Sequence, residues 1–208
     1  FQGADEIIIT NLDKKINIEN KVLLEQICAE STVPISYFGG VDSLESFKSI
    51  LGIGFDRIGL NSALLNNTHI LKNISEVYGE QSVIVGIDLT HKNGVYKILD
   101  PVKNKPLDLD IEKYVNEIEN KGVGEFRFLF TDAEGHLNKI KLDIISYISN
   151  LSSKPIIYEG GISNLDDLYK IFKEDVLSVA LGSMLVFSDY NIIKIKKFLK
   201  ERNFKIRV

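Results

Sequence analysis

Small and hydroxyl-bearing residues follow apolar segments at two separate places in the chain, in the same order each time. Gly39-Gly40 and then Asn61-Ser62 form the first set, and Gly160-Gly161 and then Gly182-Ser183 form the second. Glycines let backbone N–H groups approach an anion closely, and a helix that begins there adds the positive end of its dipole. Each set is therefore a candidate phosphate cup, and two cups predict a ligand with a phosphate at each end. The alternative is duplicated tight-turn chemistry.

Asp88 ends the otherwise apolar segment SVIVGID. A carboxylate in such surroundings needs either a partner or a chemical task. Burial raises the pKa of a carboxyl group toward the working pH, which suits general acid and base catalysis. The alternative is a structural carboxylate that caps a loop. By the symmetry of the two sets, we expect a second catalytic Asp on a strand that would precede Phe1.

A long internal repeat positions these residues. Pro34–Ala63 and Pro155–Met184 align without a gap, and each contains an apolar run, a Gly-Gly turn, an amphipathic helix, a second apolar run and a small polar pair. A repeat of this length indicates the architecture directly. Because strands alternate with helices, the sheet should be parallel. The predicted fold class is α/β, a (βα)8 TIM barrel built from two half-barrel repeats.

The chain has 208 residues, fewer than the roughly 250 of a complete barrel. The strand Ser82–Asp88 has no counterpart in the first half. We therefore expect that the first βα unit is missing and that residues 1–208 form a single barrel domain, with strands two to eight of eight. We also predict a helix over Glu19–Ser31 that buries Val22, Leu23 and Ile27, and a hairpin at Asn93-Gly94.

Composition limits the classes of function. The net charge of −4 argues against nucleic acid as a general partner. No apolar run approaches the roughly 18 residues of a membrane span, and no signal peptide is visible. The lone Cys28 is expected to be an inert thiol, and no spacing of His, Cys or carboxylates predicts a metal site. A cytoplasmic enzyme without a cofactor or metal is the expectation.

The segments GADEIIITNLD, YGEQSVIVGID, KGVGEFRFLFTDAEG and KPIIYEGGISNLDDL resemble, in this order, segments of the cyclase subunit of imidazole glycerol phosphate synthase, from histidine biosynthesis. The resemblance runs from end to end. It implies that a glutaminase subunit docks at the N-terminal rim of the barrel and releases ammonia into its interior. At the other mouth, ammonia would react with a bisphosphorylated aminoimidazole carboxamide ribonucleotide to give imidazole glycerol phosphate.

The resemblance also assigns roles to individual residues. Asp88 matches one of two catalytic Asp residues. The residues that match the two phosphate sites are Gly40, Asn61 and Ser62 for one, and Gly135, Gly161, Gly182 and Ser183 for the other. The residues that match the ammonia gate and the glutaminase-facing rim are Glu6, Arg57, Glu125 and Asp56, with Arg57 standing where Lys is usual. Ordinary solvated barrel ends are the alternative for those charges.

Departures from the family pattern, including the following two, leave other functions open. Phe38 replaces the first glycine of the family's Gly-Gly-Gly, and Glu159 stands where Ser is expected beside a phosphate cup, where a carboxylate would repel an anion. The charged rim matches the family better than the substrate mouth does. One alternative is therefore an ammonia-conducting scaffold subunit of a sugar amidotransferase system in surface-glycan biosynthesis. A lower alternative is the sister phosphoribosyl isomerase.

Overall fold

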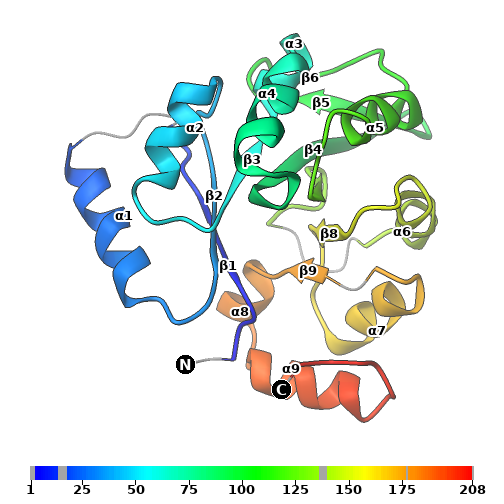
Figure 1. The fold of residues 1–208 in the computed structure, drawn as a ribbon. Helices are drawn as coiled ribbons and strands as arrows, with labels where there is room; N and C mark the ends of the chain where they lie inside the picture. The colour runs from blue at the N-terminus through cyan, green and yellow to red at the C-terminus, as the bar shows by residue number, and fades with distance from the viewer. Residues whose placement is uncertain (1–2, 14–17, 136–139, 177, 208) are drawn as a thin grey trace. The chain divides into compact units, whose positions relative to one another are not determined.

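The structure is a computed structural model that describes residues 1–208 except for 1–2, 14–17, 136–139, 177 and 208 (Figure 1). The contacts within the chain divide it into two compact units. The N-terminal unit comprises Asp5–Gly86 and Glu117–Phe126, and the C-terminal unit is formed mainly by Ile87–Asn116 and Arg127–Val208. The single domain expected over residues 1–208 stays a prediction.

Parallel strands and helices alternate in the N-terminal unit. Its elements are β1 (Ile7–Thr10), α1 (Ile18–Glu30), β2 (Ile35–Phe38), α2 (Leu44–Leu51), β3 (Arg57–Leu60), α3 (Ser62–Asn66), α4 (His69–Tyr78), the 3-10 turn η1 (Glu80–Ser82) and the first residues of β4 (Val83–Lys92). β1 pairs with β2, β2 with β3 and β3 with β4, all parallel. The strands β2 and β4 are nearly all buried, as expected when helices cover a parallel sheet.

The C-terminal unit repeats this alternation. Its elements are the remainder of β4, the hairpin strand β5 (Val95–Asp100), β6 (Lys105–Pro106), α5 (Ile111–Glu119), β7 (Glu125–Phe130), α6 (Leu142–Ser149), β8 (Ile156–Glu159), α7 (Leu165–Lys173), β9 (Ser178–Ala180), α8 (Ser183–Phe187) and α9 (Ile192–Lys200). The first residues of β7 and the last of α5 belong to the N-terminal unit. β8 and β9 are parallel, whereas β4 and β5 form the antiparallel hairpin predicted at Asn93-Gly94.

The hydrogen-bonded strand order is β1-β2-β3-β4-β7-β8-β9, and β5 and β6 are attached to β4. With the alternating helices, this order confirms the predicted α/β fold class of the (βα)-barrel type. The further βα unit that we expect before Phe1 stays a prediction.

The two copies of the repeat share their local backbone. Gly39 and Gly40 have φ angles of 134° and 66°, and Gly160 and Gly161 have φ angles of 114° and 73°. In each copy the loop then ends in an N-cap with extended backbone, Ser43 before α2 and Asn164 before α7. The side chain of each cap accepts a hydrogen bond from the backbone N–H three residues later, which satisfies a donor that the helix leaves free. The repeat in sequence is thus a repeat in structure.

One helix face differs from the prediction. In α1, Val22 and Leu23 are exposed by 50% and 55%, whereas Leu24 is 7% exposed. The inward face therefore contains Leu24 rather than the two residues before it. Cys28, one turn further on, lies against Gly54, where an added Cβ would meet the Cys28 Cβ at 3.1 Å. Apolar residues are spread around this helix, so their spacing did not single out the buried face.

Candidate functional site

The predicted phosphate residues of the N-terminal unit lie at the ends of two paired strands. We call Gly40, Asn61 and Ser62 the N-terminal cup. Because Phe38 of β2 pairs with Gly59 of β3 in parallel register, the loops that follow the two strands emerge at the same end of the sheet. Asn61 and Ser62 are half-buried at the start of α3, and Gly40 is exposed.

The first glycine of each Gly-Gly pair is required by its surroundings. A Cβ on Gly39 would lie 2.5 Å from the backbone oxygen of Asn11, and a Cβ on Gly160 would lie 2.8 Å from the backbone oxygen of Phe130. Both positions also have a positive φ, which residues other than glycine rarely adopt. The backbone at the end of the neighbouring strand therefore fits against each loop only because glycine is present.

Phe38 changes the surroundings of the N-terminal cup. Its ring lies against Gly59, where an added Cβ would meet ring atoms at 2.1 Å. A Cβ on Gly86 would come within 3.2 Å of the same ring and 3.4 Å of the Asn61 Nδ2 atom. The ring is thus buried beside Asn61, in a place that a glycine at position 38 would leave empty.

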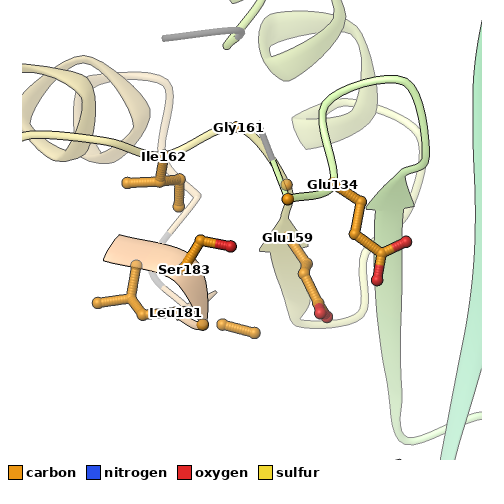
Figure 2. A pocket seen from close by; sticks show the side chains of 10 residues that line it. Glu134, Glu159, Gly161, Ile162, Leu181 and Ser183 are labelled. Carbon is orange, nitrogen blue, oxygen red and sulfur yellow. The ribbon is translucent and has the colours of Figure 1, made fainter. Parts of the chain in front are cut away.

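The predicted phosphate residues of the C-terminal unit surround one pocket. We call Gly135, Gly161, Gly182 and Ser183 the C-terminal cup. They line a cavity of about 120 Å³ at the ends of β8 and β9. Figure 2 shows the Ser183 hydroxyl oxygen directed toward the side on which Glu159 lies. A Cβ on Gly135 or on Gly182 would meet nothing within 4 Å, so the cup is open at both residues.

Two carboxylates also line this pocket. Glu159 ends β8, and Glu134 comes from the loop after β7. In Figure 2 the two side chains extend in the same general direction. Glu159 is paired with an arginine, because the Arg127 Nε donates to Glu159 Oε2 at 2.5 Å. The Arg127 side chain is only 10% exposed. Sequence reasoning identified Glu159 as a departure but missed the arginine beside it.

The predicted catalytic residue Asp88 lies within β4 and is 8% exposed. Immediately after it, the end of β4 is joined to the end of β7, because Thr131 N donates to Leu89 O at 3.0 Å. Asp132 strengthens this junction. It accepts a hydrogen bond from Thr90 Oγ1 at 3.0 Å and one from His91 N at 2.5 Å. The strand segment that contains Asp88 is therefore fixed on its C-terminal side.

Polar side chains form a cluster at the hairpin beyond Asp88, and we did not predict this cluster from the sequence. Lys141 Nζ donates to His91 Nδ1 at 3.0 Å and lies 5.7 Å from the centre of the Tyr96 ring. The Tyr96 hydroxyl is 3.4 Å from both carboxylate oxygens of Asp143. Burial, followed by the charge of Asp143, raises the pKa of Tyr96 to about 12. Tyr96 therefore remains a neutral hydrogen-bond donor at neutral pH.

The predicted gate residues come together at the beginnings of the strands of the N-terminal unit. We call Glu6, Arg57 and Glu125 the arginine cluster. Arg57 NH1 donates to Glu125 Oε2 at 2.5 Å, and Arg57 NH2 pairs with Glu6 Oε2. The side chains of Arg57 and Glu125 are 21% and 11% exposed, whereas that of Glu6 is 41% exposed. The guanidinium thus bridges one buried and one exposed carboxylate.

Electrostatics distinguish the members of this cluster. Burial raises the pKa of Glu125, and the Arg57 charge partly opposes that rise. Nearby, the fully buried Ser36 hydroxyl has no hydrogen-bond partner among the described residues. Asp56 is separate from the arginine cluster in its bonding. It is exposed, and its carboxylate accepts a hydrogen bond from Ile35 N at 2.8 Å, which ties the start of β3 to the start of β2.

The described residues contain neither a cluster suited to a metal ion nor a helix suited to crossing a membrane. Across that part of the chain, no group of three or more His, Cys, Asp or Glu side chains is placed to hold a metal ion. No helix within it combines the length and the apolar character that crossing a membrane requires.

Comparison with known proteins gives a consistent result. Residues 1–191 match the model of a family described as histidine biosynthesis protein. The chain is similar to the imidazole glycerol phosphate synthase subunit HisF of Dictyoglomus thermophilum, with 30% identity over 100% of the chain and 83% of that relative. It is 28% identical to the same subunit of Dictyoglomus turgidum over the same shares. It is 30% identical to that of Clostridium botulinum, over 100% of the chain and 84% of the relative.

Proposed function

The chain belongs to the histidine biosynthesis protein family, and from this premise we propose that it is the cyclase subunit of an imidazole glycerol phosphate synthase. Its substrate would be a bisphosphorylated aminoimidazole carboxamide ribonucleotide, which ammonia converts to imidazole glycerol phosphate with release of a ribonucleotide by-product. The relatives named above are HisF subunits, and their similarity covers 100% of this chain. The cytoplasmic location predicted from the sequence stays a prediction.

The observation that carries the proposal is the duplicated cup. Each unit has a Gly-Gly loop with positive φ angles after one strand and a small polar residue after the next strand. Such loops present backbone N–H groups to an anion without a blocking side chain. A substrate with two phosphate groups matches one cup in each unit. Asp88 would supply general acid and base catalysis, accepting a proton from one reacting group and returning it to another.

The arginine cluster supports a glutaminase partner as the source of ammonia. It lies at the beginnings of the strands, whereas both cups lie at the ends. In folds of this type the ends of the strands hold the chemistry, so a charged group at their beginnings has another task. We assign it the entry of ammonia, with Arg57 moving away from a carboxylate to let the small neutral molecule pass. The exposed Asp56 beside it would face the glutaminase.

A second candidate function is supported by Phe38. Its buried ring lies beside Asn61, in a place that the family leaves to a glycine. That change alters a substrate cup and leaves the arginine cluster intact. It favours an ammonia-conducting scaffold subunit of a sugar amidotransferase system, which would keep the glutaminase partner without cyclising a substrate.

A reconstitution experiment tests the proposal. The full chain is supplied with the ribonucleotide and either a matched glutaminase with glutamine or an ammonium salt alone, and imidazole glycerol phosphate is measured. We expect product in both cases. Asp88→Asn should lower the rate by at least about 100-fold, because general acid and base catalysis contributes that much. Asp108→Asn removes an exposed carboxylate of the same unit and should leave the rate unchanged.

The same experiment separates the two candidates. Glutaminase activity that increases when the chain is added, with no imidazole product from either nitrogen source, would refute the cyclase and support the scaffold. Equal rates for Asp88→Asn and Asp108→Asn would refute the role of Asp88.

A further inference from the structure

The C-terminal cup contains a negatively charged side chain that by itself would repel the proposed phosphate ligand. Glu159 lines the pocket together with Gly161 and Ser183. Its side chain is 23% exposed, so the carboxylate is partly shielded from water. Two like charges within a few ångströms of each other repel strongly where water screens them poorly. A phosphate in this cup would therefore be opposed by Glu159 unless another group offsets the charge.

Arg127 is placed to do so. It lies on β7, next to the cup rather than in its lining, and its Nε is 2.5 Å from the Glu159 carboxylate. With 10% of its side chain exposed, it is more deeply buried than Glu159. Of the two members of the ion pair, Glu159 is therefore a lining residue of the pocket and Arg127 is not.

We infer that Arg127 is a positioning residue that sets the charge of the C-terminal cup. Its guanidinium holds the Glu159 carboxylate in a fixed place and cancels the charge of that residue, so that Glu134 is the one carboxylate of the described lining whose charge Arg127 does not offset. The repulsion of a phosphate-bearing group is thereby reduced. This inference rests on the proposed role of the cup as a phosphate site. It adds a residue that touches the ligand only through Glu159, and it explains how a carboxylate is compatible with an anion site.

A purely structural role would not account for the pair. Replacing a buried ion pair by apolar residues of similar size is often neutral or stabilising, so such a pair is a poor means of holding two strands together. A pair whose acidic member lines a pocket acts on whatever enters that pocket. The two roles therefore predict different behaviour when both charges are removed together.

The test is a double-mutant cycle read by phosphate binding to the full chain. Inorganic phosphate is titrated into ¹⁵N-labelled protein, and the amide signals of Gly161 and Gly182 report binding at this cup. Arg127→Met should weaken phosphate binding by about tenfold or more, because Glu159 then remains uncompensated. Glu159→Gln should strengthen it, and Arg127→Met with Glu159→Gln should bind within about threefold of the unaltered chain.

Two further variants complete the design. Lys170→Met removes a cation from the exposed pair with Asp166 in the same unit, and it should leave phosphate binding unchanged. Arg127→Lys keeps the positive charge and should bind like the unaltered chain, which also covers the case in which Arg127→Met does not fold.

The outcomes are distinct. If the double variant binds as weakly as Arg127→Met, the arginine is structural and the inference is wrong. If phosphate shifts the Gly161 and Gly182 signals equally in every variant, the charge of Arg127 is irrelevant, whereas the cup itself stands. If phosphate shifts neither signal in the unaltered chain, the phosphate site of the proposed function fails, and this inference fails with it.

Discussion

Replacing Arg57 by Met should destabilise the chain, and more so at high pH. The substitution keeps the aliphatic stem and removes the charge that bridges Glu6 and Glu125. The Arg57 and Glu125 side chains are 21% and 11% exposed. Breaking a fully buried pair costs about 3–5 kcal/mol, which this partial exposure reduces to about 2–3 kcal/mol. The Glu6 side chain is 41% exposed, so that pair adds less than about 0.5 kcal/mol.

The pH dependence follows from Glu125. Burial already raises its pKa in the folded chain, and loss of Arg57 removes the interaction that opposes the rise. The folded chain then binds a proton that the unfolded chain releases, so stability falls as the pH rises from the unfolded pKa through the folded one. The Arg57→Met variant should therefore lose more stability at about pH 8 than at about pH 5, because a raised pKa lets Glu125 bind a proton more readily at the lower pH.

Urea unfolding followed by circular dichroism at both pH values measures the effect. Lys21→Met is the control, since it breaks an exposed pair with Glu25 on α1 and should cost less than about 0.5 kcal/mol. Adding Glu125→Gln to Arg57→Met should recover most of the loss at about pH 8. Equal destabilisation at the two pH values, or no recovery in the double variant, would refute this reasoning.

Two further predictions concern the glycines and Tyr96. Gly39→Ala should destabilise the chain by about 1–3 kcal/mol because of its positive φ and the nearby Asn11 oxygen. Gly182→Ala should cost less than about 0.5 kcal/mol, since its Cβ would meet nothing within 4 Å. The added methyl group in the cup should nevertheless weaken phosphate binding. Urea unfolding and phosphate titration of the two variants check this, and equal stability losses would contradict it. Tyr96 should remain protonated up to a pH of about 12, and Asp143→Asn should lower that pKa by removing a nearby negative charge. Phenolate absorbance of the unaltered chain minus that of Tyr96→Phe isolates this group, and a difference signal that titrates at the ordinary tyrosine pKa would be inconsistent with the burial of Tyr96.

The repeat made most of the fold predictable. An apolar run, Gly-Gly, an amphipathic helix, a second apolar run and a small polar pair recur in order, so the strands β2, β3, β8 and β9 and the loops after them could be placed from the residues alone. The N-cap at Ser43 and the hairpin at Asn93-Gly94 were predictable because each depends on local chemistry.

The pairing of side chains was less predictable, because it depends on which strands become neighbours. Glu125 and Arg127 are two residues apart on β7, so their side chains lie on the same face of the sheet. That signal was present in the sequence, but choosing Glu159 as the partner of Arg127 requires the register of another strand. The buried face of α1 was missed for a different reason, since its apolar residues do not define a single stripe.

Both glycine loops are braced from within. After the first, Ser43 and Ser46 exchange hydrogen bonds, and after the second, Asp167 accepts from Ser163 while Asn164 accepts from Asp167 N. The hydrogen bonds described for each turn join residues of the same copy of the repeat. Segments 39–46 and 160–167, which include both members of each bracing pair, should therefore be interchangeable: grafting one in place of the other should preserve the backbone of the loop. Substitutions in one loop could then change which ligand that half of the repeat binds, while the other loop keeps its residues and its backbone.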